Sequence, residues 1–188
     1  MQTVVRRKNC GRKLVVLGAE CTGKTSLCLA LAAQRAGVVV AEVLRDFCAH
    51  AGRTPTAAEQ YLIFQTQIEQ EASALRQAGP QGWVWCDSGP LMTALYSQIY
   101  FADAGLMPEA LRHQSSYAAC LVMAPDLGWQ ADGIQRDGPA MQQTAHQALL
   151  DLLRQHQLPH HVISGQALLR QAAAQAQIAA ITGLESAP

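Results

Sequence analysis

A stretch near the amino end of the chain has the residue types and spacing that bind a triphosphate. Residues 18–25 read Gly-Ala-Glu-Cys-Thr-Gly-Lys-Thr and match the phosphate-loop pattern GxxxxGK[ST] at every fixed position. Gly18 and Gly23 let the backbone curl so that its N–H groups point at phosphate oxygens, and a following helix adds its positive dipole end. Lys24 is expected to contact the β and γ phosphates, and the Thr25 hydroxyl to bind Mg²⁺. ATP and Mg²⁺ are therefore the predicted cofactors.

The predicted nucleotide-binding residues extend one position past this motif. They are Gly18, Ala19, Glu20, Cys21, Thr22, Gly23, Lys24, Thr25 and Ser26. A guanine-specific GTPase would also need an Asn-Lys-x-Asp segment on a late strand. The single asparagine is Asn9, ahead of the loop, and no lysine follows Lys24. The sequence therefore excludes that class.

Two acidic residues stand at the ends of apolar runs. Asp87 closes the run 83–86, and Glu42 follows the run 38–41. In a parallel sheet the carboxyl ends of the strands line the ligand crevice, so both side chains are expected to face it. Asp87 suits either the second position of the Mg²⁺ site or the acceptance of a proton from an attacking hydroxyl. Glu42 competes for the second role, and the sequence does not rank the two.

The elements that must position these residues alternate between strand and helix. Apolar runs predict strands at 13–17, 38–41, 83–86, 120–123 and 161–163. Helical composition and spacing predict helices at 25–35, 57–77, after Gly89-Pro90 through Tyr100, 141–156 and 165–181. The alternation predicts an α/β fold of the P-loop NTPase class, with a parallel five-stranded sheet flanked by helices on both faces.

Length and composition limit the alternatives. With 188 residues the chain fits one ordinary domain, and we expect a flexible basic leader at 1–12, a single P-loop kinase domain at 13–188 and a lid loop at about 125–140. Its 49% apolar residues and zero formal net charge match neither disorder nor the basic surplus of a nucleic-acid binder. No apolar run has the length of a membrane span or of a signal-peptide core. We therefore predict a cytoplasmic protein that binds neither nucleic acid nor membrane, and leave a homo-oligomer open.

Four segments together resemble a known family. They are the phosphate loop 18–25, the segment 41–47, the segment 86–93 with Tyr96-Ser97, and the segment 125–129 with Asp132-Gly133. The phosphate loop alone is generic, but its combination with the Asp87 and Trp129 segments is fairly specific. The chain is similar over most of its length to the nicotinamide riboside kinase domain of NadR-type proteins and their stand-alone P-loop relatives. The resemblance implies a nucleoside/nucleotide-kinase-like fold.

The resemblance also implies an activity, namely phosphorylation by ATP of the ribose 5′-hydroxyl of nicotinamide riboside to give nicotinamide mononucleotide. The aromatic clamp of the family matches Trp129, with Tyr96 as its partner, and a cationic pyridinium ring over either side chain would gain cation–π attraction. A Trp129 that only anchors its loop is the alternative. Asp87, Arg45 and Asp132 complete the predicted substrate-binding set.

Two arginines are predicted to act at this site. Arg136, in the loop 125–140, is the candidate lid arginine, because a guanidinium binds phosphate oxygens bidentately. Arg45, just past the second strand, is expected either to contact the riboside or to pair with Glu42. The family often has proline where Gly128 stands, and its arginine follows Asp-Gly sooner than Arg136 does.

Two other functions stay open at this point. The first is a kinase for another nucleoside or nucleotide, which would differ in what fills the Trp129 pocket. The second is a non-kinase ATP-binding regulatory module. The adenylyltransferase domain of NadR-type proteins is not expected in 188 residues, so its NAD-forming step is not carried over.

Overall fold

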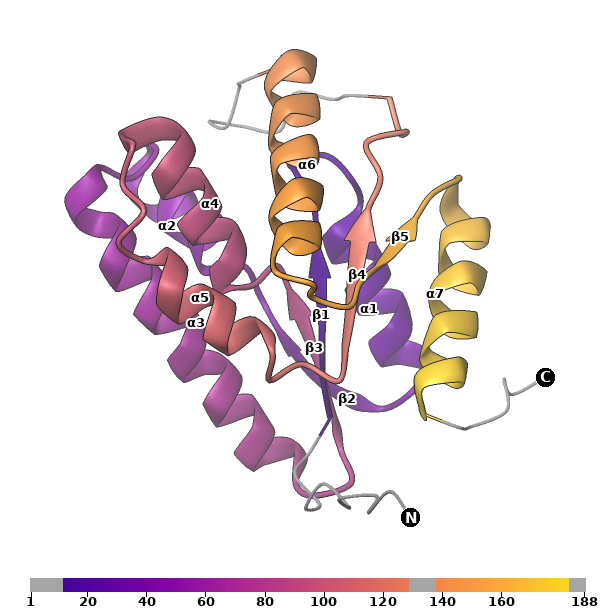
Figure 1. Ribbon diagram of the computed structural model, residues 1–188. Helices are drawn as coiled ribbons and strands as arrows, with labels where there is room; N and C mark the ends of the chain where they lie inside the picture. The colour runs from indigo at the N-terminus through magenta and orange to yellow at the C-terminus, as the bar shows by residue number, and fades with distance from the viewer. Residues whose placement is uncertain (1–11, 129–137, 183–188) are drawn as a thin grey trace, which may run out of the picture.

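The strands form one parallel sheet that carries helices on both faces (Figure 1), as the alternation in the sequence predicted. The computed structural model describes residues 12–128 and 138–182. Its strands are β1 (Arg12–Leu17), β2 (Gly37–Val40), β3 (Trp83–Asp87), β4 (Ala119–Met123) and β5 (His161–Ile163). Their order across the sheet is β2-β3-β1-β4-β5, and all four pairings are parallel. β1 is therefore central, and the loop that follows it opens at the middle of the carboxyl edge.

Seven helices lie within the described residues. They are α1 (Lys24–Gln34), α2 (Val43–Ala51), α3 (Ala57–Ala78), α4 (Pro90–Phe101), α5 (Met107–Gln114), α6 (Gly138–Gln155) and α7 (Ala167–Thr182). The sequence did not predict α2 or α5, because each is short and neither begins with a strong capping signal. None of these helices is long and apolar enough to span a membrane.

Alternation along the strands divides the core between the two faces of the sheet. Val15 and Leu17 of β1 pack with α3, α4, α5 and α6, whereas Leu14 and Val16 pack with α1 and α7. All four of these side chains are fully buried. A strand buried on both faces reads as a continuous apolar run, which is why β1 was recognisable in the sequence.

The start of α3 is fixed by a set of polar side chains. Thr56 and Glu59 form a capping box, and Arg53 donates two hydrogen bonds of 2.8 Å to the Glu59 carboxylate. The hydrogen bonds from Arg53, followed by those from Thr56, lower the pKa of Glu59 to about 2. This anchoring sets the direction of the first turn of α3, which contributes to the pocket described below.

A buried charged cluster lies at the start of β1. Lys13 Nζ donates to Glu71 Oε2 at 2.9 Å, and His113 Nε2 lies 2.7 Å from the same oxygen. The Tyr117 hydroxyl donates to Glu71 Oε1 at 2.7 Å. Both oxygens of this fully buried carboxylate therefore have partners, and the Lys13 ammonium also lies 4.5 Å from the centre of the Tyr117 ring.

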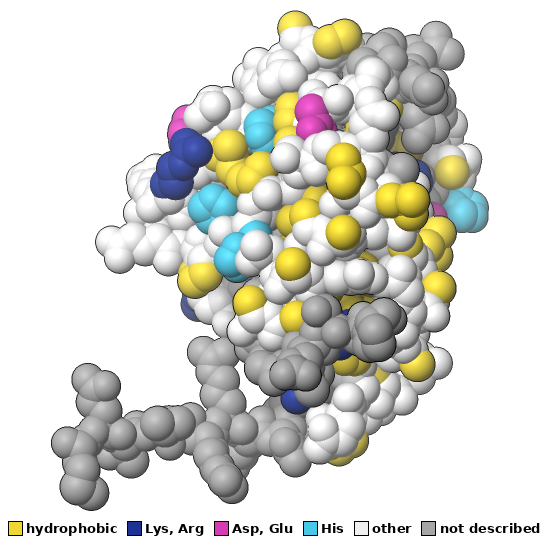
Figure 2. Space-filling view, turned by 90° about the vertical axis from the view of Figure 1, so that its right-hand side faces the viewer, with side chains coloured by type: hydrophobic (Ala, Val, Ile, Leu, Met, Phe, Trp, Pro, Cys, Tyr) yellow, Lys and Arg dark blue, Asp and Glu magenta, His cyan; other side chains and the backbone are white. Residues whose placement is uncertain are grey.

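The face that carries β5 and α7 exposes several apolar side chains. Val162 is 49% exposed, Leu168 77% and Leu169 69%. Figure 2 looks onto this side of the molecule and shows hydrophobic side chains scattered among polar ones. Isolated apolar residues of this kind are ordinary on protein surfaces.

Candidate nucleotide and acceptor site

The loop after β1 has the curled backbone that the sequence predicted. Gly18 (φ 148°), Gly23 (φ 81°) and Cys21 (φ 55°) all have positive φ. A Cβ atom at Gly18 would lie 3.1 Å from both the Cβ and the carbonyl oxygen of Met123 in β4. The position therefore needs glycine both for its dihedral angle and for the close approach of β4.

Lys24 lies against this loop as the first residue of α1. Its ammonium donates to the Ala19 carbonyl oxygen at 3.0 Å, and the residue is 5% exposed. The Thr22 hydroxyl donates to the same carbonyl at 2.8 Å. An ammonium has three donors, so Lys24 keeps capacity for phosphate oxygens at the start of α1.

Asp87 is placed beside the loop by strand pairing. β3 runs next to β1 with Val16 opposite Asp87, and the Thr25 hydroxyl donates to Asp87 Oδ2 at 2.5 Å. The other oxygen, Oδ1, is buried and has no hydrogen-bond partner among the described residues. A buried carboxylate oxygen without a donor fits a cation ligand, because leaving it unpaired is costly.

The oxygens of Thr25 and Asp87 are compatible with a Mg²⁺ ion bound between them and a nucleotide. Mg²⁺ is usually held by one or two protein oxygens together with the phosphates of a nucleotide. Thr25 and Asp87 would supply those protein oxygens, and the bound ion would neutralise charge on the phosphates. The Asp87 carboxylate also contributes, after burial, to raising the pKa of the Cys28 thiol beneath it in α1.

Two helices from the carboxyl-terminal half of the chain hold the loop from opposite faces of the sheet (Figure 1). Gln142 Nε2, from α6, donates to the Glu20 carbonyl oxygen at 2.8 Å. Arg170 Nη1, from α7, donates to the Thr22 carbonyl oxygen at 2.7 Å. Both side chains are buried, and no local sequence pattern marks either of them.

Arg170 also connects the loop to the ends of β4 and β5. Its Nη2 donates to the Ala124 carbonyl oxygen at 2.9 Å and pairs with Asp126. Its Nε donates to the Gly165 carbonyl oxygen at 2.5 Å. One guanidinium thus joins the phosphate loop to the segment that leads from β4 toward residues 125–140. A planar fork of five N–H donors makes this possible.

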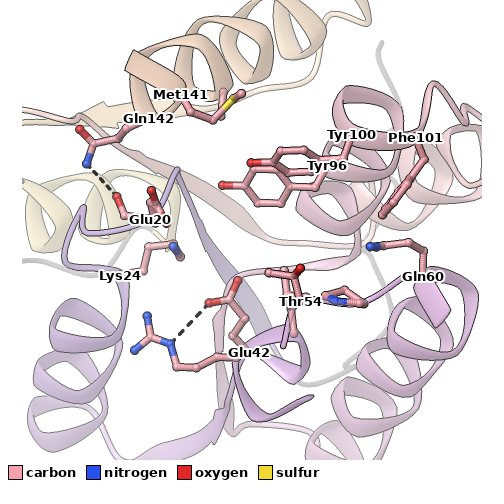
Figure 3. A pocket seen from close by; sticks show the side chains of 14 residues that line it. Glu20, Lys24, Glu42, Thr54, Gln60, Tyr96, Tyr100, Phe101, Met141 and Gln142 are labelled. Carbon is pink, nitrogen blue, oxygen red and sulfur yellow. Dashed lines mark hydrogen bonds and ion pairs between the residues drawn. The ribbon is translucent and has the colours of Figure 1, made fainter. Parts of the chain in front are cut away.

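A pocket of about 360 Å³ opens beside the loop and lies among α2, α3, α4 and α6. It is lined by Glu20, Lys24, Glu42, Leu44, Arg45, Thr54, Pro55, Gln60, Tyr96, Tyr100, Phe101, Met141, Gln142 and Ala145. In Figure 3 Lys24 and Glu20 lie at one end, Tyr96, Tyr100 and Phe101 form a wall at the other, and Glu42 lies between. Tyr96 and Tyr100 stack with ring centres 5.8 Å apart and an angle of 25° between their planes.

Glu42 enters this pocket from the start of α2. It is 8% exposed, and Arg45, which is 45% exposed, lies with its Nε 3.8 Å from Glu42 Oε2. The Val43 N–H donates to Gln67 Oε1 of α3 at 3.0 Å, which holds the first turn of α2 in place. The predicted pair of Glu42 and Arg45 is therefore present, and both residues also line the pocket.

The structure brings some of the predicted site residues together. Lys24, Glu42, Arg45 and Tyr96 line one pocket, and Asp87 bonds to Thr25 at its phosphate end. Ser26 lies exposed in the first turn of α1.

Three other predicted residues, Trp129, Asp132 and Arg136, lie outside the described residues.

The sequence reasoning missed several residues of the pocket and of its support. They are Gln60, Tyr100, Phe101, Gln142 and Arg170. The spacing of Tyr96 and Tyr100, one helical turn apart, was a usable signal for an aromatic wall.

The fold and the loop define a P-loop protein with the sheet architecture of nucleoside and nucleotide kinases. A family model described as an AAA domain matches residues 13–170. The chain belongs to this family. No curated protein sequence matches the chain.

Solved structures with the same fold include two of NadR. The NadR protein in complex with NR superposes with a TM-score of 0.82 at 18% identity, over 95% of this chain and 53% of that one. NadR in complex with NAD and AMP-PNP gives 0.78 at 17% identity, over 95% and 51%. This chain therefore spans about half the length of those NadR chains. The predicted resemblance to NadR-type proteins is confirmed at the level of the fold.

Thymidylate kinase from Candida albicans has the same fold over most of its length. It superposes with a TM-score of 0.64 at 13% identity, over 93% of each chain. The fold is thus not particular to NadR.

Proposed function

We propose that this protein is an ATP-dependent kinase that phosphorylates the ribose 5′-hydroxyl of nicotinamide riboside. The observation that supports it is the continuity of the site. One pocket joins the Lys24 end, where phosphates would lie, to the acidic Glu42 and to the aromatic wall of Tyr96 and Tyr100. A flat cationic ring against tyrosine faces, near a carboxylate, gains cation–π and charge attraction.

The positions of Asp87 and Glu42 suggest that the two carboxylates have different roles. Asp87 bonds to Thr25 and would serve the metal, whereas Glu42 lines the acceptor pocket and would accept the proton of the ribose hydroxyl. Lys24 and the loop amides would hold the phosphates and neutralise their charge. Arg45, half exposed beside Glu42, would contact the riboside or set the orientation of that carboxylate.

The test is ATP consumption with a panel of acceptors, followed by product analysis. We expect nicotinamide riboside to stimulate ATP hydrolysis or transfer at least about tenfold, with nicotinamide mononucleotide as product. Thymidine, deoxyadenosine and thymidylate should stimulate less. Lys24→Ala should abolish turnover with every acceptor, because the ammonium that faces the phosphates is lost.

Two results would contradict the proposal. Stronger stimulation by thymidylate or by another nucleoside would assign the pocket to a different acceptor of the same class. Nucleotide binding without stimulation by any acceptor would favour an ATP-binding regulatory module instead.

A further inference from the structure

A buried glutamine on the wall of the pocket has an amide oxygen that the described residues leave without a hydrogen bond. Gln60 lies in the first turn of α3 and is 4% exposed. It lines the acceptor pocket, and its Oε1 is buried with no hydrogen-bond partner among the described residues. Figure 3 shows its amide beside Phe101 and Thr54, at the end of the pocket away from Lys24.

A second glutamine of the same helix shows how such a side chain is ordinarily used. Gln67 lies about two turns further along α3 and is 3% exposed. Its Oε1 accepts the Val43 N–H at 3.0 Å and so supports the start of α2. Its buried Nε2 has no partner among the described residues, but Gln67, unlike Gln60, does not line the acceptor pocket. Within the described part of the chain, no donor reaches Gln60 Oε1 in this way, although Thr56, Glu59 and Arg53 fix the turn that carries the residue. A buried oxygen without a donor is costly to keep, so its partner is expected from outside the protein.

The surroundings of Gln60 restrict the chemistry of that partner. A primary amide offers one acceptor oxygen and one NH₂ donor, and the group that complements both is another amide. Phe101 and the Tyr96–Tyr100 stack form the adjoining wall, which suits a flat ring. The ring would lie at the opposite end of the pocket from the phosphates, with the reacting hydroxyl between them near Glu42.

We propose that Gln60 determines acceptor specificity by pairing with an amide on the acceptor's ring. This proposal rests on the acceptor pocket of the proposed function but not on one particular ring. Two sources present the same chemistry, namely the carboxamide of nicotinamide riboside and the ring lactam of a nucleoside such as thymidine. Nicotinic acid riboside, which has a carboxylate in place of the carboxamide, lacks the NH₂ group that Gln60 Oε1 would accept from.

The experiment compares Gln60→Leu, Gln60→Glu and the wild-type chain with nicotinamide riboside, nicotinic acid riboside and thymidine. Gln60→Leu keeps the approximate volume and removes both hydrogen-bonding groups, and we expect kcat/KM for the amide-bearing acceptor to fall about 10- to 100-fold. The KM for ATP should stay unchanged, because Gln60 lies away from the phosphate loop. Gln60→Glu keeps an acceptor for the NH₂ group but repels a carboxylate, so nicotinic acid riboside should lose more than nicotinamide riboside does.

Gln77→Leu is the matched control. It makes the same chemical change at an exposed position of α3, and it should leave every kinetic constant as in the wild type. Nucleotide binding by each variant, measured by calorimetry, shows that the fold and the loop are intact. The acceptor whose kcat/KM falls in Gln60→Leu identifies which of the two amide sources is used.

The outcomes separate this inference from the proposed function. Suppose that the wild-type enzyme phosphorylates these acceptors and that Gln60→Leu keeps the wild-type kcat/KM for all three. Gln60 then does not bind an amide of the acceptor, and the inference is wrong, whereas the proposed kinase activity is unaffected. If no acceptor stimulates the wild-type enzyme, the proposed function is wrong. In that case, the shifts in melting temperature caused by nicotinamide riboside and thymidine show whether Gln60 pairs with an amide. Shifts that are lost in Gln60→Leu support the amide pairing, and absent or equal shifts overturn it.

Discussion

Two buried lysine–carboxylate regions, one near each end of the central strand, differ in whether the protein satisfies the carboxylate oxygens. At the start of β1, Lys13 and Glu71 are buried, and the carboxylate has a hydrogen-bond partner for each oxygen. At the other end, Lys24 and Asp87 are equally buried, but Asp87 Oδ1 has no partner among the described residues.

The difference supports the proposal that the Lys13 end is structural and that the Asp87 end would bind a ligand. A buried charge that serves the fold must be satisfied by the protein itself, because the desolvation cost is otherwise uncompensated. A charge that serves a ligand stays incompletely satisfied until that ligand arrives. We therefore expect substitutions at the Lys13 end to change stability and substitutions at the Asp87 end to change activity.

The largest effect is expected from Lys13→Met, which leaves Glu71 buried without its ammonium partner. The free energy of unfolding should fall by about 3–5 kcal/mol, as is typical when one member of a buried pair is removed. Urea denaturation measures this change. The double variant Lys13→Met with Glu71→Leu should recover much of the loss. A single variant as stable as the wild type would contradict the structural assignment.

Asp87→Asn should have the converse effect. We expect kcat to fall about 100- to 1,000-fold and the Mg²⁺ concentration for half-maximal rate to rise, because the carboxylate proposed to bind Mg²⁺ would become a neutral amide. The free energy of unfolding should stay within about 0.5 kcal/mol of the wild type or increase, since the amide removes a buried charge. Steady-state kinetics over a Mg²⁺ titration, with urea denaturation alongside, separate the two. A large loss of stability with normal kinetics would show that Asp87 serves the fold and not a ligand.

Arg170→Lys should give a smaller effect at the same end of the sheet. A lysine cannot keep the separate hydrogen bonds to Thr22, Ala124 and Gly165, so the loop would be held less firmly. We expect the KM for ATP to rise about tenfold while kcat falls less, measured at saturating acceptor. Arg76→Lys, at an exposed position of α3, is the control and should change neither constant.

The smallest expected effect concerns how the free energy of unfolding changes with pH under acidic conditions. Burial acts to raise the pKa of Glu71, but the hydrogen bonds from His113 and Lys13 and the charge of Lys13 hold it below its ordinary value of 4.5. A carboxyl with a lower pKa in the folded state stabilises the fold above its unfolded pKa, and this contribution is lost as the pH falls through the folded pKa. In Glu71→Gln the unfolding free energy should therefore change less with pH below about 4.5 than in the wild type. Glu69→Gln, exposed on the same helix, should keep the wild-type pH dependence.

The sequence predicted those parts of the site that are encoded locally. The loop 18–25 and Asp87 follow apolar strands, so their position at the carboxyl edge could be inferred from the order of elements alone. The fold class followed from the same alternation.

The remaining parts depend on contacts between distant segments. Gln60 and Arg170 look like ordinary polar residues of helices, and only the packing of α3 and α7 shows that both are buried. Helix α2 was missed for a related reason: it is nine residues long, and part of its stabilisation comes from Gln67 of α3. That Glu42 lines the pocket, on which its proposed role rests, also could not be inferred from the sequence alone.

The two supports of the phosphate loop have a consequence for the order of events during synthesis. Gln142 contacts Glu20 across 122 positions of the chain, and Arg170 contacts Thr22 across 148. When β1 and α1 of a nascent chain have emerged from the ribosome, the phosphate loop therefore lacks both supports until α6 and α7 have also emerged. Contacts of such long sequence separation form late and slowly in folding. Nucleotide affinity should consequently arise only after α7 has emerged, which makes ligand capture a reporter of folding through α7.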